Sequence, residues 1–261
     1  MHCEAAELIR KIDRDHVAVC IKLLGIRIER NAHSLKISDR AVICMPYHKQ
    51  MDILEEDRLG DAKFGSTRRG ISPVYADKYM KKGIRMGDLL MDPAALEKKV
   101  AGIVEWKNLT VHDGYHADAI RTEDMLAWLK TYGDPLKQYI CDTTYYLSDA
   151  IAHDKSIMFE AQLGALRDID FGIYPYTSAS STIAAYAPIG AGIPFQKLDK
   201  VIGVMKAYST CVGEGPFTAE FFGEEGDALR NAGAEFGAAT GRPRRVGGFD
   251  VVASRYGVMV Q

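Results

Sequence analysis

The sequence lacks the cysteine patterns that mark a disulfide framework or a zinc site. Its five cysteines are odd in number and far apart, no CxxC pair occurs, and no cysteine–histidine group has zinc spacing. It also lacks an apolar run approaching the roughly 20 residues that a membrane span requires. Its N-terminus has no cationic flank before an apolar stretch, as a signal peptide would. We therefore expect reduced thiols, no metal-binding residue, a cytoplasmic location and no membrane partner.

A surplus of positive charge is also missing. Lysine and arginine number 33 against 35 aspartate and glutamate residues, which gives a formal net charge of −2. That balance does not favour a nucleic-acid-binding protein. The 261 residues are 47% apolar and 26% charged, an ordinary globular composition of a length that can bury a substantial core. The sequence contains no internal repeat and no GxxxxGK[ST] phosphate loop.

Three stretches in the middle of the chain have signals for helices. The aspartate–proline pair at 92–93 combines an N-cap with proline at the first helical position and predicts a helix to about Trp106. The pair at 134–135 repeats this signal and predicts a helix to about Ala152. Between them, apolar residues at helical spacing predict a helix over residues 122–130.

Two short apolar runs have the length and composition of strands. They cover residues 156–160 and 201–205, and each is followed by a loop rich in glycine, serine, threonine or proline. A further apolar run, residues 17–28, could be strand or helix. Strands that alternate with helices, with polar loops at the strand ends, favour an α/β fold that binds ligands at those ends.

Loop 1, residues 65–73, reads Gly-Ser-Thr-Arg-Arg-Gly-Ile-Ser-Pro. Its two glycines permit tight turns and the close approach of a ligand. The hydroxyls and guanidiniums between them can hold a phosphate by hydrogen bonds and charge. A solvated basic turn is the alternative, and these residues alone do not decide between the two.

Loop 2, residues 159–178, follows the first of the predicted strands. It contains Gln162, Arg167, Asp168 and Asp170, and a cluster of hydroxyls comes at its end. An amide that both donates and accepts suits a purine edge, and clustered hydroxyls suit a phosphate. The alternative is a long polar loop in which an aspartate caps a neighbouring element. Loops of this length in compact domains are usually functional.

Loop 3, residues 235–245, reads Glu-Phe-Gly-Ala-Ala-Thr-Gly-Arg-Pro-Arg-Arg. Three arginines follow a flexible stretch, and arginine forks match carboxylates and phosphates in a bidentate way. A local basic patch for nucleic acid is the rival interpretation. No other run of this kind occurs in the sequence, so a small anionic ligand is preferred.

Together and in this order, the three loops resemble the adenylosuccinate synthetase family. The resemblance covers the chain from about Leu35 to the C-terminus. Several other runs match the family in the same order: Asp77-Lys78, Gly83-Ile-Arg-Met-Gly-Asp88, Asp168-Ile-Asp170, Gly172-Ile-Tyr-Pro-Tyr176, Lys206-Ala-Tyr-Ser-Thr210 and Val212-Gly-Glu-Gly-Pro-Phe217.

The resemblance implies a fold and a reaction. The fold would be the α/β, P-loop-NTPase-related mixed sheet of the family, flanked by helices and incomplete. Residues 1–34 would be an atypical N-terminal segment, and residues 35–261 would be the central part of the catalytic domain, with a helical insertion at about 92–152. The family is a GTP-dependent ligase that uses Mg²⁺. GTP phosphorylates the 6-oxygen of IMP, and the amine of L-aspartate then displaces the phosphate to give adenylosuccinate. The family also implies a homodimer.

Roles carry over to this chain position by position. Thr67 and Ser178 resemble hydroxyls that bind the IMP phosphate, and Gln162 resembles a glutamine that contacts IMP near the reacting oxygen. Lys81 falls where the family has an arginine that reaches into the IMP site of the neighbouring subunit. Arg242 resembles the arginine between IMP and the aspartate loop. The segment that closes on aspartate and GTP would contain Ala238, Ala239, Thr240, Gly241, Arg242, Pro243 and Arg244.

Two parts of the family pattern have no counterpart in this sequence. Nothing in residues 1–34 resembles the Gly-Asp-Glu-Gly-Lys-Gly-Lys loop, which supplies the catalytic aspartate, a magnesium contact and the phosphate cradle. The Thr-Lys-Leu-Asp segment that reads guanine is absent as well. We therefore expect the chain to be truncated at both ends relative to the family and inactive alone. A non-catalytic module that binds IMP or pairs with another subunit is the alternative.

Overall fold

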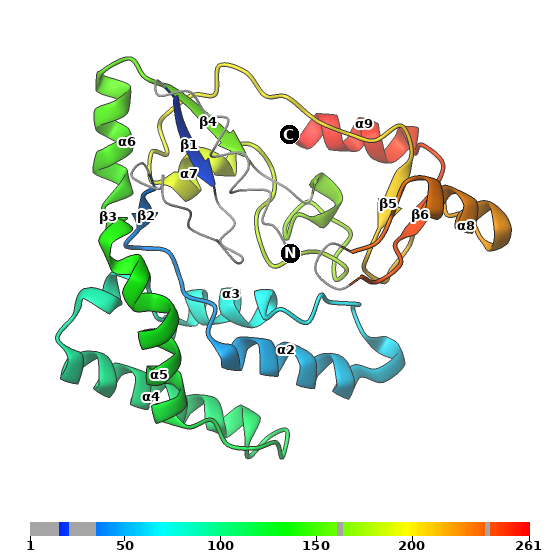
Figure 1. The fold of residues 1–261 in the computed structure, drawn as a ribbon. Coiled ribbons are helices and arrows are strands. Elements are labelled where there is room, and N and C mark those ends of the chain that lie inside the picture. The colour runs from blue at the N-terminus through cyan, green and yellow to red at the C-terminus, as the bar shows by residue number, and fades with distance from the viewer. Residues whose placement is uncertain (1–15, 21–34, 161–163, 238–240) are drawn as a thin grey trace.

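A computed structural model describes residues 16–20, 35–160, 164–237 and 241–261 (Figure 1). Helices predominate. The α-helices are α2 (Pro46–Leu59), α3 (Ile71–Met80), α4 (Pro93–Val111), α5 (Thr122–Gly133), α6 (Thr143–Ala152), α7 (Tyr186–Ala191), α8 (Gly223–Ala232) and α9 (Val251–Val260). Short 3-10 helices are η2 (Gly60–Ala62), η3 (Met86–Leu90), η4 (Asp134–Tyr139) and η5 (Ala165–Arg167).

The strands form small sheets of two strands each. β1 (His16–Cys20) pairs in parallel with β4 (Ser156–Glu160), and β2 (Ile37–Ser38) pairs in parallel with β3 (Ile140–Cys141). β5 (Ser209–Cys211) pairs antiparallel with β6 (Arg245–Gly247), with Cys211 opposite Arg245. Mixed helices and parallel strands make this an α/β fold with small sheets.

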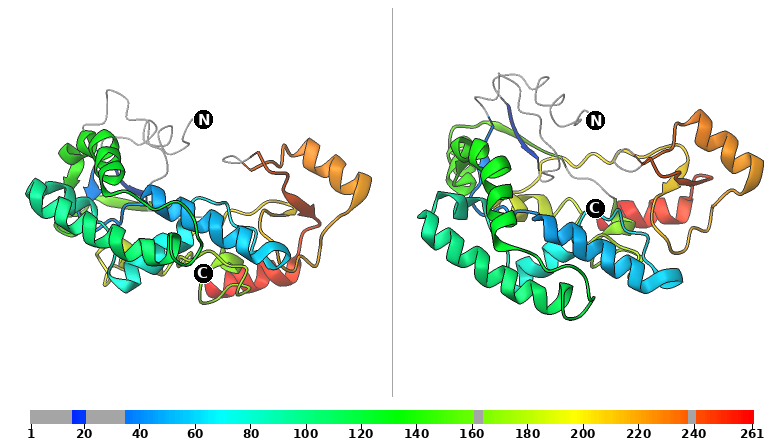
Figure 2. Two further views of the ribbon diagram at one scale, coloured as in Figure 1. Left: turned by 90° about the horizontal axis from the view of Figure 1, so that it is seen from below. Right: turned by 60° about the horizontal axis from the view of Figure 1, so that its bottom comes forward.

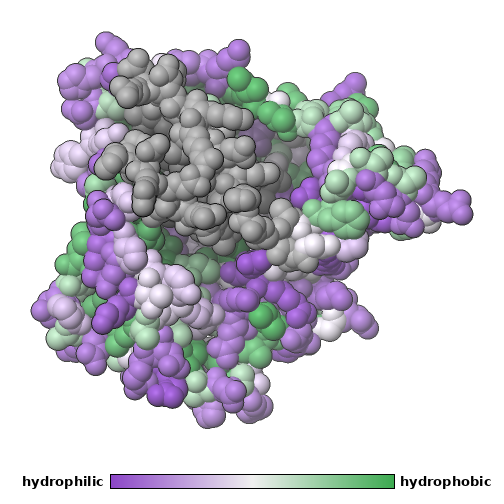
Figure 3. All heavy atoms as spheres, viewed as in Figure 1, coloured by the Kyte–Doolittle hydropathy of each residue, from purple (hydrophilic) through white to green (hydrophobic). Residues whose placement is uncertain are grey.

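The main core lies within the helical layer formed by α2, α4, α5 and η3. Ile84, Val100 and Val111 have no exposed surface, and Leu129 of α5 packs with them. In Figure 2, this layer stays together in both views, while α8 projects with β5 and β6 to one side. Figure 3 shows a mainly hydrophilic surface over the helical layer, with apolar side chains in separate patches.

Two predicted helices form as expected. The carboxylate of Asp92 accepts the backbone N–H groups of Ala94 and Ala95 at 3.0 and 3.2 Å, and Pro93 is the first residue of α4. An N-cap acceptor and a proline that needs no N–H partner both favour a helix start. The helix continues to Val111, five residues beyond the predicted end. α5 covers the predicted range of residues 122–130 and ends at Gly133.

The helix predicted from Asp134 to about Ala152 is wrong in its first half. Residues 134–139 form the short η4, Ile140 and Cys141 pair with β2, and α6 begins only at Thr143. A second N-cap explains the break, because the carboxylate of Asp142 accepts the N–H groups of Thr144 and Tyr145. Pairing with β2 and a new cap together override the first helix signal.

The strand prediction for residues 156–160 is confirmed by β4, and that for residues 201–205 is wrong. The segment between α7 and β5 carries no strand, and within the described residues no strand pairs with it. Its apolar side chains are exposed: 73% of Ile202 and 95% of Val204. A strand needs a partner for its backbone groups, and a short apolar run does not supply one.

Across the described ranges, no helix is both long and apolar enough to span a membrane.

Candidate functional site

Loop 1 is held by two buried carboxylates on one face of α2. Glu56, which is 4% exposed, accepts three consecutive backbone N–H groups at 3.0–3.1 Å, those of Phe64, Gly65 and Ser66. Asp52, four residues earlier on the same helix, is 7% exposed. Buried carboxylates are costly unless hydrogen-bonded, so these contacts fix the start of the loop.

Asp52 fixes the other end of loop 1. Its two oxygens accept the Ser66 hydroxyl and the Gly70 N–H, both at 2.8 Å. Gly70 has φ +83° and lies against the backbone of His48, where a Cβ would approach within 2.6 Å. Thr67 lies at the exposed tip between these two anchors. The two anchored ends leave Thr67 exposed at the tip of the loop.

The segment 212–217 packs directly against loop 1. The Glu214 N–H donates to the Phe64 carbonyl oxygen at 3.1 Å. Gly65 has φ +73°, and a Cβ there would lie 2.7 Å from the Glu214 nitrogen. Glycine is therefore required at residue 65 both for its backbone conformation and for this close approach. This contact joins loop 1 to a segment about 150 residues later in the chain.

Loop 2 is organised by the Asp168 carboxylate, which has no exposed surface. It accepts three backbone N–H groups at 2.6–3.0 Å, those of Asp170, Phe171 and Thr182. Burial acts to raise the pKa of Asp168, but these backbone donors outweigh it and the pKa is lowered from the usual value. The ionised carboxylate thus closes the loop around residues 168–182.

Ser178 is positioned inside this closed loop. Its N–H donates to the Arg167 carbonyl oxygen at 2.8 Å, and its hydroxyl lies 3.1 Å from that of Ser180. The Arg167 guanidinium donates to the Tyr176 carbonyl oxygen and contacts the sulfur of Cys211 at the end of β5. Loop 2 therefore reaches Cys211, which directly precedes the segment 212–217 that contacts loop 1.

An aromatic contact joins loop 2 to Phe64, the residue directly before loop 1. The rings of Phe64 and Tyr176 pack edge to face with centroids 6.4 Å apart. Gly215, with φ +93°, lies against the Tyr176 ring, where a Cβ would approach within 2.4 Å. The two loops and the segment 212–217 thus form one packed cluster.

Each arginine of loop 3 is paired with a glutamate. Arg242 contacts Glu214 at 2.9 Å, and Arg244 contacts Glu235 at 2.9 Å. Arg245, on β6, pairs with both oxygens of Glu220 and also donates to the Gly213 and Gly215 carbonyl oxygens. Through Arg242 and Arg245, loop 3 joins the same cluster.

Glu235 anchors the base of loop 3. It is 3% exposed and accepts the Tyr208 hydroxyl at 2.5 Å, the Arg244 guanidinium and the Lys206 ammonium. Burial acts to raise the pKa of Glu235, but Lys206, Tyr208 and Arg244 together lower it below the usual value. The Gly237 N–H donates to the Arg242 carbonyl oxygen at 2.8 Å and closes the loop above this base.

The structure brings some predicted residues together and leaves others apart. Thr67, Ser178 and Arg242 belong to loops that meet at the segment 212–217. Lys81 is exposed at the far end of α3, with φ +60°, about 15 Å along that helix from loop 1. Gly241, Pro243 and Arg244 lie within loop 3, and their roles stay predictions. The other predicted residues lie outside the described residues: Gln162, Ala238, Ala239 and Thr240.

Sequence reasoning assigned no role to four acidic residues that hold the loops: Asp52, Glu56, Glu214 and Glu235. Asp52 and Glu56 are spaced i, i+4 and so share one face of a helix, which is a usable signal. The pairing of Glu214 with Arg242 joins residues 28 positions apart. Local patterns do not reveal such a pair.

The described residues contain no preformed cluster of metal-ligating side chains. In the ranges that the structure covers, no three acidic, histidine or cysteine side chains are grouped so that they could hold a metal ion. The acids nearest the loops are engaged by N–H donors, arginines or lysine, as described above.

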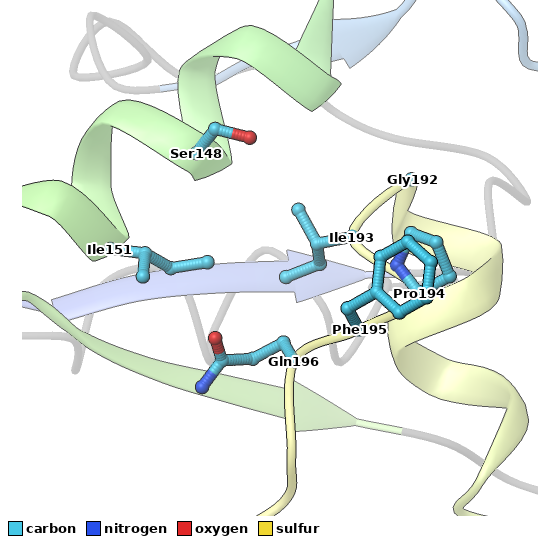
Figure 4. Close-up of a pocket in the computed structure, with 7 residues that line it drawn as sticks. All are labelled: Ser148, Ile151, Gly192, Ile193, Pro194, Phe195 and Gln196. Atoms are coloured by element: carbon cyan, nitrogen blue, oxygen red, sulfur yellow. The ribbon is translucent and has the colours of Figure 1, made fainter.

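One cavity lies away from the loops (Figure 4). It has a volume of about 310 Å³ and is lined by Ser148 and Ile151 of α6 and by residues 192–196, after α7. Phe195 at its rim is 98% exposed, so the cavity is open to solvent. None of the predicted site residues lines it.

The fold and the three loops define an α/β protein that presents hydroxyl and guanidinium groups on converging loops. The family model of adenylosuccinate synthetase matches residues 20–261. The chain is 44% identical to adenylosuccinate synthetase of Bacillus licheniformis over 230 residues, which is 87% of this chain and 53% of that protein. It is 45% identical to that of Heliobacterium modesticaldum, with 88% of this chain and 54% of the relative covered.

A solved structure agrees with this match. The fully ligated adenylosuccinate synthetase from Plasmodium falciparum superposes with a TM-score of 0.77 at 33% identity, covering 84% of this chain and 51% of that one. This chain belongs to the adenylosuccinate synthetase family, a family of GTP-dependent ligases in purine biosynthesis. It spans about half the length of the curated relatives it matches.

Proposed function

We propose that this chain supplies the IMP and aspartate side of the GTP-dependent ligation of L-aspartate to IMP. The observation that carries the proposal is the convergence of loops 1, 2 and 3 on residues 211–217 in a member of this family. This cluster brings hydroxyl and guanidinium donors from three distant parts of the sequence to one place.

Each loop has a part in the proposed binding. The Thr67 and Ser178 hydroxyls donate to the phosphate of IMP, and Arg242 engages the anionic groups of IMP and aspartate. Arginine provides a planar fork for such groups, and hydrogen bonds to charged acceptors are the strong ones. Gln162 would contact IMP near the 6-oxygen, and Arg244 with residues 238–241 would face aspartate and GTP.

The chemistry is mostly that of positioning and charge stabilisation. In the proposed reaction, GTP phosphorylates the 6-oxygen of IMP, and the aspartate amine then displaces that phosphate. Donors held rigidly toward the developing charge lower the barrier more than mobile ones do. The described loops are those proposed to hold IMP and aspartate. We therefore propose IMP binding as the property of this chain to test first.

The binding partners of this chain and its location in the cell are also proposed here. The three arginines of loop 3 face carboxylates within the protein, which supports a small anionic ligand over nucleic acid. We propose a homodimer in which Lys81 reaches toward the IMP site of the second copy, and a cytoplasmic location. GTP is the proposed co-substrate, with Mg²⁺ as the proposed metal ion.

A panel of thermal unfolding measurements tests the proposal. IMP should raise the Tm of the chain, whereas inosine, which lacks the phosphate, should raise it much less. Only a ligand that binds the folded state stabilises it in this way. Equal Tm values with IMP, with inosine and without ligand would contradict the proposed function.

A further inference from the structure

Glu214 sits at the meeting point of loops 1 and 3, and nothing in the proposed reaction uses it. Its carboxylate contacts the Arg242 guanidinium at 2.9 Å through a single pair of atoms. Its backbone N–H is bonded to loop 1 through the Phe64 carbonyl oxygen. One residue thus joins the loop that carries Thr67 to the loop that carries Arg242.

The backbone around Glu214 is held firmly on both sides. Arg245 donates to the carbonyl oxygens of Gly213 and Gly215, at 3.3 and 2.8 Å. Gly65 packs against the Glu214 nitrogen, and the Tyr176 ring packs against Gly215. The Glu214 carboxylate is therefore presented from a fixed backbone to an arginine near the end of loop 3.

The Glu214–Arg242 ion pair is partly exposed to solvent. The side chains of Arg242 and Glu214 are 39% and 36% exposed. Ion pairs that remain in contact with water contribute little to stability, because water and salt screen them. By contrast, Arg244 pairs with Glu235, whose side chain is 4% exposed, and Arg245 pairs with both oxygens of Glu220. Arg242 thus has the most exposed carboxylate partner of the three.

We propose that Glu214 is an affinity-determining residue that competes with anionic ligands for Arg242. Its carboxylate has the same chemistry as the carboxylate or phosphate that an arginine fork recognises. An anion that engages Arg242 must displace Glu214 or share the guanidinium with it. Because the pair is exposed to water, an arriving anion can exchange with the Glu214 carboxylate. Only the identity of the natural anion rests on the proposed function.

Chemical modification of Arg242 by phenylglyoxal tests this role, with each arginine-containing peptide measured by mass spectrometry. In Glu214→Gln, Arg242 should react about two- to fivefold faster than in the wild type, which is the range expected for loss of an exposed ion pair. Glu214→Asp, which shortens the side chain, is a second variant. Glu224→Gln, which removes one exposed charge at the start of α8, is the matched control and should leave the rate unchanged. Arg244 and Arg245 serve as internal controls.

Protection by anions completes the test. Inorganic phosphate, and separately IMP, should protect Arg242 at concentrations about two- to fivefold lower in Glu214→Gln than in the wild type. An unchanged Arg242 rate in Glu214→Gln, or equal protecting concentrations in both proteins, or no protection by any anion, would overturn the proposal. Protection by phosphate but not by IMP would leave the role of Glu214 intact and count against the proposed function.

Discussion

At the residue scale, the loops owe their shape to buried acids more than to the residues proposed to bind ligand. Asp52, Glu56, Asp168 and Glu235 are each less than 10% exposed, and each accepts at least two hydrogen bonds. An acid in such a setting is costly to disturb, since its donors are left buried and unpaired. The exposed groups Thr67 and Arg242 can then change partners without loss of the loop.

Replacing Asp168 by asparagine tests this division of roles. The asparagine side chain keeps one oxygen that can accept hydrogen bonds. Its NH₂ group replaces the second carboxylate oxygen and faces backbone N–H groups, which are also donors. We expect a loss of about 2 kcal/mol in the free energy of unfolding, measured in urea. Asp170→Asn, two residues along the same loop, is the matched control and should lose much less. Equal losses in the two variants would contradict the anchoring role of Asp168.

A second residue-scale prediction concerns the pH dependence of stability. His48 has no exposed surface; its Nδ1 accepts the Met45 N–H at 2.9 Å, so its Nε2 carries the proton and donates to Asp77 at 2.8 Å. The other oxygen of Asp77 accepts Lys107. Burial is the main cause that lowers the pKa of His48, and the Lys107 charge adds to it, although Asp77 opposes both.

The sign of the effect follows from linkage. Because the folded pKa of His48 lies below its unfolded value of about 6.5, the unfolded chain binds more protons between the two values. The free energy of unfolding should therefore fall as the pH drops below about 6.5. Urea unfolding at several pH values measures this, and His48→Gln should flatten the decline. If the free energy of unfolding of His48→Gln falls with the same slope, the pH dependence comes from other titratable groups.

At the element scale, local signals predict an element where no competing contact intervenes. Asp92 and Pro93 start α4 as expected, because the cap and the proline act within one turn. Residues 134–152 contain two such signals, and only the structure shows that Asp142 and the pairing with β2 interrupt the helix. The strand at residues 156–160 forms because β1 is beside it, whereas residues 201–205 have no partner among the described residues.

The unpaired segment gives a prediction at this scale. Val204 is 95% exposed and Val100 of α4 is fully buried. Val204→Ser should therefore change the free energy of unfolding by no more than about 0.5 kcal/mol. Val100→Ala should lose about 2 kcal/mol through lost burial and the cavity left behind. Val204→Ser should also reduce aggregation, measured by light scattering, since it removes an exposed apolar group. A large loss of stability in Val204→Ser would show that this segment is packed in solution.

At the scale of the whole molecule, the sequence predicts the family and the order of the loops, but not how they meet. Loops 1 and 2 are separated by 85 residues of chain and loops 2 and 3 by 56. Their contacts run through residues 211–217, and local patterns do not show which distant residues pair, so the roles of Glu214 and Glu235 were missed. The domain division and the helical insertion at about 92–152 stay predictions.

Lys81 gives the prediction that belongs to the assembly. If two copies pair as proposed, Lys81→Glu should weaken IMP binding, because a charge of the wrong sign then enters the neighbouring site. Lys81→Arg should strengthen it, since the bidentate fork is restored. Light scattering of the same samples reports the oligomeric state. A monomer at all concentrations, or IMP affinity that is equal in the three proteins, would contradict the cross-subunit role.

The most direct test of the central claim is IMP binding by isothermal titration calorimetry. The account predicts saturable binding to the wild-type chain that is weakened about tenfold or more by Ser178→Ala and by Arg242→Ala, since each removes a hydrogen bond to a charged group. This would show that loops 2 and 3 contribute to one site. A folded chain that gives no heat with IMP, or binding that neither substitution changes, would contradict the account.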